Sequence, residues 1–117
     1  QKKNIELRIS SDFKKLILLT KKLTDQNNID LYFVYLPDSN RYKNNNFSKN
    51  TFSYDYEKIL NYLNLLNIKV IDLHKDLLVN NKDPKLRRST GDHFTKEGYG
   101  VVSKFIFKSI SDNKDNN

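Results

Sequence analysis

The chain has 117 residues, so it forms one domain at most. Of its residues, 37% are hydrophobic and 30% are charged, and seven Tyr and seven Phe are present. Disordered chains are poor in aromatic residues, so this composition argues against a disordered protein. The net charge of +7 is spread along the sequence without a basic block, which indicates a solvated surface and does not favour a nucleic-acid partner. The absence of cysteine excludes disulfides, thiolate metal ligands and a cysteine nucleophile, and it leaves the cellular compartment undecided.

The first predicted element is an amphipathic helix that ends at about Gln26. Ser10, Ser11 and Asp12 each offer an N-cap side chain at its start. Apolar residues then recur at helical spacing, namely Phe13, Leu16, Ile17 and Leu23. The segment "NNID" that follows predicts the end of this helix.

An uninterrupted apolar run, "LYFVYL" at 31–36, comes next and stops at Pro37. The run is too short for a typical helix, and it is typical of a strand buried on both faces, as in a parallel sheet. The following segment, 37–50, is polar and rich in turn-forming residues, so we expect a surface loop there. Its repeated asparagines argue against a packed role.

A second helix is predicted to begin at Ser53. Asp55 and Glu57 then fall in its first turn, where acidic side chains interact favourably with the helix dipole. The predicted buried face consists of Tyr56, Ile59, Leu60, Leu63 and Leu66.

A short second strand is predicted at 68–71, and a helical turn from about Leu73 to Val79 follows it. Asp72 stands directly between the strand and this turn, so we expect it to be the N-cap of the turn. His74 is expected on the surface of the same turn.

A loop of fifteen residues, 80–94, leads to the last helix, which is predicted from Lys96 to about Ser111 with Thr95 as its N-cap. Loops of that length without secondary structure are usually functional or disordered. The apolar stripe of the helix is Val102, Phe105, Ile106 and Ile110. Gly98 costs a helix about 1 kcal/mol relative to alanine, so we expect a close backbone approach there. Residues 112–117 are expected to fray.

The order helix, strand, helix, strand predicts an α/β fold with right-handed crossovers and a parallel sheet. Two strands are convincing, and Ile5, Leu7 and Ile9 alternate as in a doubtful third. Two strands cannot cover three amphipathic helices, because sheets usually have about four to six strands. We therefore expect residues 1–117 to be the C-terminal portion of one larger domain that is incomplete at its N-terminus.

Ligands of an open parallel sheet bind beyond the carboxyl ends of its strands. Three segments are expected at that edge: the loop after Leu36, the turn after Ile71, and the loop that carries Asp92 and His93. A loop histidine, with an ordinary pKa of about 6.5, can take a proton from a serine hydroxyl and return it to a leaving group. His93 is therefore the candidate general base, and the alternative is an exposed histidine near a helix start.

The segment "GDHFTKEGY", residues 91–99, resembles the last conserved block of the SGNH, or GDSL-like, hydrolases. In that family a loop histidine is followed five residues later by a glycine and an aromatic residue as the C-terminal helix begins. His93, Gly98 and Tyr99 fit that spacing. The stretches "LYFVYLPDSNRY" and "IKVIDLHKDL" also look like later strands of the family, so the similarity covers about residues 12–111.

The resemblance implies a three-layer α/β/α domain with a parallel sheet, of the flavodoxin-like SGNH type. It also implies a serine-dependent esterase, acylhydrolase or O-acyltransferase that acts on an acyl ester or an O-acylated carbohydrate without a cofactor or metal. His93 would be the general base. The family's "GDS" and "GxND" blocks do not occur in the sequence. We therefore expect the serine nucleophile to lie outside this chain, which alone should be inactive.

The acid of this site stays open, because the family usually places an aspartate three residues before the histidine and Thr90 occupies that position. Asp92 is one candidate for the group that orients His93. The other is a serine and histidine pair in which a backbone carbonyl helps.

Other functions remain alternatives. One is a small basic non-catalytic α/β module that binds nucleic acid or an acidic partner, and another is a degenerate hydrolase-like scaffold. Arg41, Arg87 and Arg88 lie on predicted loops and could meet an anionic substrate, although surface solubility explains them as well. Metal binding is not expected from two histidines nineteen residues apart without thiols. No apolar run approaches the ~20 residues of a membrane span.

Overall fold

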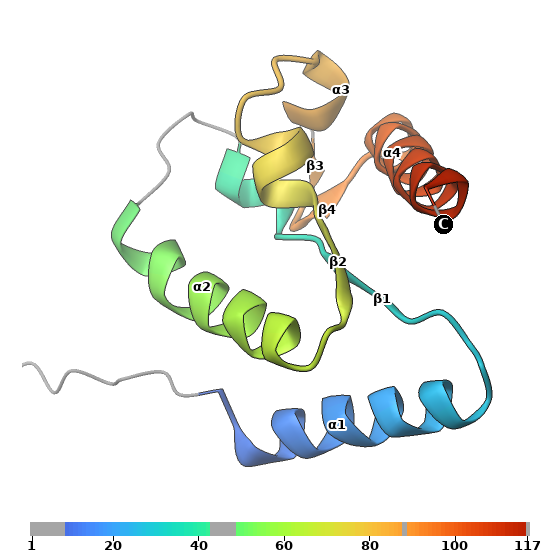
Figure 1. Ribbon diagram of the computed structural model, residues 1–117. Coiled ribbons are helices and arrows are strands. Elements are labelled where there is room, and N and C mark those ends of the chain that lie inside the picture. Colours follow the sequence, from blue (N-terminus) through green and yellow to red (C-terminus); the bar gives the residue numbers. More distant parts are fainter. Residues whose placement is uncertain (1–8, 43–48, 88, 117) are drawn as a thin grey trace, which may run out of the picture. The chain divides into compact units, whose positions relative to one another are not determined.

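The computed structural model of the chain describes residues 9–42, 49–87 and 89–116 (Figure 1). Its contacts divide the chain into two units. The first unit comprises Gln1–Phe33 and Ser48–Val70, and the second comprises Val34–Phe47 and Ile71–Asn117. The strands β1 (Tyr32–Tyr35) and β2 (Lys69–Asp72) pair in a two-stranded parallel sheet, and the division passes through both of them.

The predicted three-layer α/β/α fold with a wide parallel sheet is wrong. The chain is 65% helical, and the described residues form only the β1–β2 pair and a second sheet of two very short strands. All four residues of β1 are half-buried, whereas the sequence predicted a strand buried on both faces. In a two-stranded sheet every strand is an edge, so its side chains are only partly covered. Ile5 and Leu7 lie outside the described residues, and Ile9 belongs to no strand.

Two helices, α1 (Ser11–Gln26) and α2 (Lys49–Leu65), belong to the first unit. The start of α1 is predicted correctly, since the Ser10 hydroxyl accepts a hydrogen bond of 3.1 Å from the Phe13 amide. The start of α2 differs from the prediction. This helix begins four residues before Ser53, so Asp55 and Glu57 lie inside it and not in its first turn.

The helices α1 and α2 touch through a tyrosine and a lysine. The Tyr62 hydroxyl donates to the carbonyl of Lys14 over 3.0 Å, and the Lys14 ammonium lies 5.7 Å from the centre of the Tyr62 ring. Phe13 of α1 packs edge-on against Phe33 of β1, with 6.5 Å between ring centres. No residue of α1 is buried.

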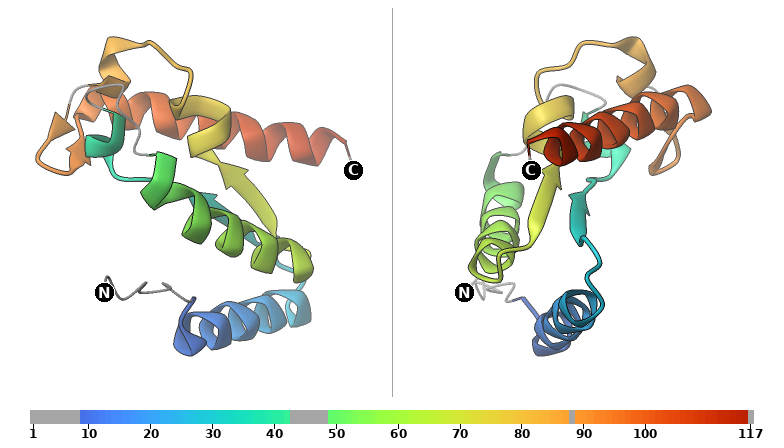
Figure 2. Two further views of the ribbon diagram at one scale, coloured as in Figure 1. Left: turned by 90° about the vertical axis from the view of Figure 1, so that its left-hand side faces the viewer. Right: turned by 45° about the vertical axis from the view of Figure 1, so that its right-hand side comes forward.

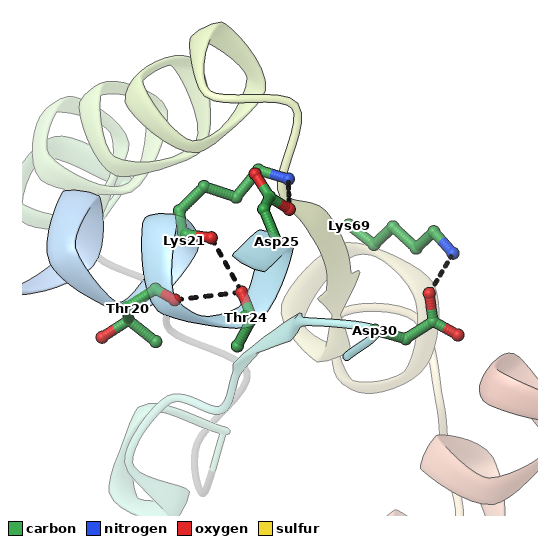
Figure 3. Close-up of polar contacts among 6 residues, drawn as sticks. All are labelled: Thr20, Lys21, Thr24, Asp25, Asp30 and Lys69. Atoms are coloured by element: carbon green, nitrogen blue, oxygen red, sulfur yellow. Dashed lines mark hydrogen bonds and ion pairs between the residues drawn. The ribbon is translucent and has the colours of Figure 1, made fainter. Parts of the chain in front are cut away.

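Polar contacts at the end of α1 and the start of the strands are drawn in Figure 3. Lys21 and Asp25 form an ion pair of 2.8 Å one helical turn apart, and Thr24 donates its hydroxyl to carbonyls of the preceding turn. Lys69 of β2 lies 3.6 Å from Asp30, just before β1. Asp25, Asp30 and Lys69 are solvent-exposed, so each of the two ion pairs adds little to stability.

The described residues of the second unit form two short turns, a short helix, a β-hairpin and a long helix. They are the 3₁₀ turn η1 (Ser39–Tyr42), the π turn η2 (His74–Leu78), α3 (Pro84–Arg87), β3 (Ser89–Thr90), β4 (His93–Phe94) and α4 (Lys96–Asp115). Its buried apolar residues are Tyr42, Ile71, Leu73, Leu78, Leu86, Phe94 and Val102. Figure 2 shows the β3–β4 hairpin at the start of α4, at the end opposite the C-terminus.

Three predictions in the second unit need correction. The segment 37–50 is not wholly a surface loop, because Pro37, Ser39 and Tyr42 are buried. The fifteen-residue loop is not structureless, because it contains α3 and a β-hairpin. The last helix continues to Asp115, four residues past its predicted end, so residues 112–115 are helical.

Candidate functional site

The hairpin β3–β4 carries the candidate base. Its strands pair antiparallel, with Thr90 opposite His93. The two loop residues are Gly91 and Asp92, and Gly91 has a φ of +62°. Two-residue hairpin loops with glycine in this left-handed conformation match the twist of the flanking strands. Glycine therefore closes the turn that places His93 at the start of the returning strand, with its ring exposed.

The hairpin is held by contacts of the residues on both sides of His93. The backbone amide of Ser39 donates to the carbonyl of Asp92 over 3.3 Å, which ties the hairpin to η1. Phe94, the residue after His93, is buried. Thr95 caps α4, because its hydroxyl accepts from the Gly98 amide over 3.2 Å, as predicted.

Gly98 is buried where α4 approaches α3. A Cβ atom added at this glycine would lie 2.8 Å from the carbonyl oxygen of Lys85 and 3.2 Å from Cβ of Phe94. The first distance is shorter than any normal contact, so the close backbone approach expected from the sequence is confirmed. Glycine at this position lets the first turn of α4 rest directly on α3 and on the base of the hairpin.

The ring of His93 faces Tyr99 from the first turns of α4. The Tyr99 hydroxyl lies 3.5 Å from Nδ1 of His93. The Tyr99 ring packs edge-on against Phe94, with 5.7 Å between ring centres and 73° between the ring planes. Tyr99 is 41% exposed, so its hydroxyl and the His93 ring share an open surface.

The predicted pair of site residues, Asp92 and His93, lies side by side at the exposed tip of the hairpin. Thr90 lies directly across the hairpin from His93. Ser39 reaches the hairpin through its backbone. Its hydroxyl is buried and has no hydrogen-bond partner among the described residues, so it is closed to a substrate.

The three segments expected near the site do meet within the second unit. Ser39, after the first strand, bonds to the hairpin, and Tyr42 of the same turn bonds to His74 after the second strand. Asp72 accepts a hydrogen bond of 3.1 Å from the Lys75 amide, which confirms its predicted capping role. The convergence is therefore brought about by turns and side-chain contacts and not by the edge of a wide sheet.

The sequence did not reveal a pair formed by the buried Tyr42 and the half-buried His74. The Tyr42 hydroxyl lies 2.7 Å from Nδ1 of His74, and the two ring centres are 5.9 Å apart. Burial raises the pKa of the Tyr42 phenol above its ordinary value, with Tyr35 and Asp72 adding to the effect, so the hydroxyl stays protonated. Burial lowers the pKa of His74 below 6.5, which Asp72 partly opposes. His74 is thus half-buried and not a surface residue as predicted.

Arg87 joins the turns around this pair. Its guanidinium donates to the carbonyls of Tyr42 over 3.2 Å, of Leu78 over 3.3 Å, and also of Asn81. It also lies 5.8 Å from the centre of the Tyr42 ring. These three bonds give Arg87 a role within the fold, beyond the surface solubility that the sequence suggested. Arg88 lies outside the described residues, and Arg41 is exposed.

Comparison with known proteins gives no match to a family model, to a curated protein or to a solved structure. In the described residues, no group of three or more His, Asp or Glu side chains could hold a metal ion. No helix within the same residues has the length and apolar character needed to cross a membrane. The candidate site is therefore defined by the geometry around His93.

Proposed function

We propose that this chain supplies His93 as the general base of a serine-dependent ester hydrolase or O-acyltransferase. The observation that carries the proposal is the placement of the ring: it is exposed, yet the residues on either side of it are tied down by burial, capping and a bond to η1. A base must stay within hydrogen-bond reach of the proton that it takes, so a fixed but open histidine suits this role. The resemblance of residues 91–99 to the SGNH block supports the same assignment.

The proposed reaction uses the imidazole twice. His93 takes the proton from a serine hydroxyl as the serine oxygen bonds to the acyl carbon, and it then gives that proton to the departing alcohol. A water molecule, or an acceptor hydroxyl in transfer, releases the acyl group by the same steps in reverse. The serine is proposed to lie outside residues 1–117, and the substrate is a small acyl ester or an O-acylated carbohydrate. The group that orients His93 is either Asp92 or another neighbour of its ring.

This proposal rests on the hairpin and on the start of α4, and it needs no wide sheet. The hairpin, the Thr95 cap and the close approach at Gly98 are all local to the second unit. They would hold His93 in the same way whatever segment supplies the serine.

The test is hydrolysis of p-nitrophenyl acetate by the full-length protein that carries this chain, compared with its His93→Ala variant. We expect turnover to fall by about 100- to 10,000-fold, the usual contribution of a general base. Added imidazole should restore part of the activity, because the His93 ring is exposed. Lys96→Ala, an exposed change just after the hairpin, is the control and should retain activity.

Unchanged turnover in His93→Ala would reject the base assignment. If the protein also bound nucleic acid in a salt-sensitive way, the alternative of a basic binding module would replace it.

A further inference from the structure

We propose that the hydroxyl of Tyr99 is the group that holds the His93 imidazole in position. In this arrangement, which rests on the proposed function, Nδ1–H of His93 donates to the phenol oxygen of Tyr99. Tyr99 is then a positioning residue, since it acts on the reaction only through His93.

The sequence of the hairpin leaves open which group accepts a hydrogen bond from Nδ1–H of His93. The position three residues before His93 is Thr90, which has no carboxylate to accept from the ring. Thr90 pairs with His93 across the hairpin. The Tyr99 hydroxyl lies 3.5 Å from Nδ1 of His93, where it can accept this hydrogen bond.

The Tyr99 hydroxyl is held in place by its own surroundings. The amide of Tyr99 donates to the carbonyl of Thr95 over 2.9 Å, so its backbone is fixed in the first turns of α4. Its ring packs against Phe94, which is buried and directly follows His93 in the chain. The same short segment therefore fixes both the ring that is held and the hydroxyl that holds it.

The distance of 3.5 Å is long for a hydrogen bond, as is common for catalytic contacts before a substrate binds. A bond from Nδ1–H to the phenol oxygen fixes the tautomer in which Nε2 is unprotonated. Only that tautomer can take the serine proton. The phenol oxygen can continue to accept from Nδ1–H once the ring becomes positively charged, so the contact is useful through the whole proton transfer.

The direct test is the tautomer of His93, read from the nitrogen NMR shifts of its ring in the protein. The two histidines of the chain are distinguished with a His93→Ala variant. We expect the Nδ1–H tautomer to dominate in the wild type and to lose population in Tyr99→Phe, which removes only the hydroxyl. Tyr62→Phe, which removes a hydroxyl that bonds to Lys14 instead, should leave the His93 shifts unchanged.

The kinetic test uses the same variants with p-nitrophenyl acetate. Tyr99→Phe should lower kcat by about tenfold, the equivalent of one neutral hydrogen bond, with KM unchanged. A structural role would instead move both parameters or the melting temperature. Tyr99→His, which restores a polar ring, should recover part of the loss.

Two results would overturn the role of Tyr99: a His93 tautomer unaffected by Tyr99→Phe, or one that shifts only in Asp92→Asn. A full-length wild type that shows the expected tautomer but no esterase activity would instead reject the proposed function and leave the contact between Tyr99 and His93 in place. The failure of one proposal is therefore distinguishable from the failure of the other.

Discussion

Helix α1 of the first unit differs from the second unit in how far its apolar side chains are buried, although Leu63 elsewhere in the first unit is buried as well. In the second unit Leu73, Leu78 and Leu86 are at most 1% exposed. In the first unit α1 has no buried residue, and its leucines Leu16 and Leu19 are 62% and 64% exposed. An amphipathic helix pattern shows that a helix can be buried on one face, but it does not show that a partner covers that face.

The hydrogen bonds donated by the side chains of α1 and its C-cap differ from those of the second unit in the same direction, although the Tyr62 hydroxyl of α2 does bond to the Lys14 carbonyl. The second unit is joined by side-chain bonds between distant segments, such as Tyr42 to His74 and Arg87 to the carbonyl of Tyr42. Within α1, the side-chain bonds of Thr20, Thr24 and Asn27 reach only three or four residues back. Bonds of the first kind constrain the fold, whereas bonds of the second kind stabilise only the helix that contains them.

The largest expected difference between the units comes from removing a leucine from each. Leu78→Ala should lower the free energy of unfolding by about 2–5 kcal/mol, because it opens a cavity at a residue that is 1% exposed. Leu19→Ala makes the same change at a residue that is 64% exposed and should cost about 0.5 kcal/mol or less. Urea unfolding followed by circular dichroism measures both. Equal losses would show that α1 is covered as tightly as the second unit.

Replacing each of two glycines of α4 by alanine should have smaller effects on stability, and the two effects should have opposite signs. Gly98→Ala should destabilise the protein by about 1–2 kcal/mol, because the clash with the Lys85 carbonyl outweighs the gain in helix propensity. Gly100→Ala meets nothing within 4 Å and should stabilise it by up to about 1 kcal/mol. Thermal unfolding of the two variants measures the difference. If both stabilised the protein, α4 would not rest on α3 at this point.

Most features that depend on neighbours in the chain were predictable from the sequence, although the start of α2 at Lys49 was not. The caps at Ser10, Asp72 and Thr95 are correct, because each requires only a side chain and an amide three residues later. The close backbone approach predicted at Gly98 is also confirmed, and it was predictable because glycine in a helix is costly without such a contact. The exposed position of His93 before α4 follows from the same local pattern.

Features that depend on distant segments were not predictable. The apolar run at 31–36 was interpreted as a strand buried on both faces, yet the burial of a strand depends on how many others pair with it. Tyr42 lies beside an asparagine-rich stretch, and nothing nearby shows that its partner is 32 residues away. The one available signal was an aromatic residue in a polar loop, because large aromatic side chains are on average well buried. The β3–β4 hairpin depends only on neighbours in the chain, yet it was missed as well, because strands of two residues carry no periodicity.

The smallest predicted effect tests whether the buried pair of the second unit senses pH. His74 has a pKa below 6.5 in the folded chain, chiefly because burial disfavours its charged form, with Arg41 acting in the same direction and Asp72 against it. The unfolded chain therefore binds the proton more readily than the folded chain does. The contribution of neutral His74 to the free energy of unfolding should be fully present above pH 6.5. It should decline as the pH falls from there through the lowered pKa of His74.

Protonation of His74 would also disrupt its hydrogen bond with Tyr42. A neutral His74 accepts a hydrogen bond from the Tyr42 hydroxyl at Nδ1, whereas a protonated ring has no lone pair there and the buried hydroxyl must donate elsewhere. His74→Gln removes the titrating group, so its free energy of unfolding should lose less between pH 7.5 and pH 5 than that of the wild type. Urea unfolding at the two pH values gives the comparison. Equal losses in both proteins would mean that protonation of His74 is not linked to folding and that the pair acts only through packing.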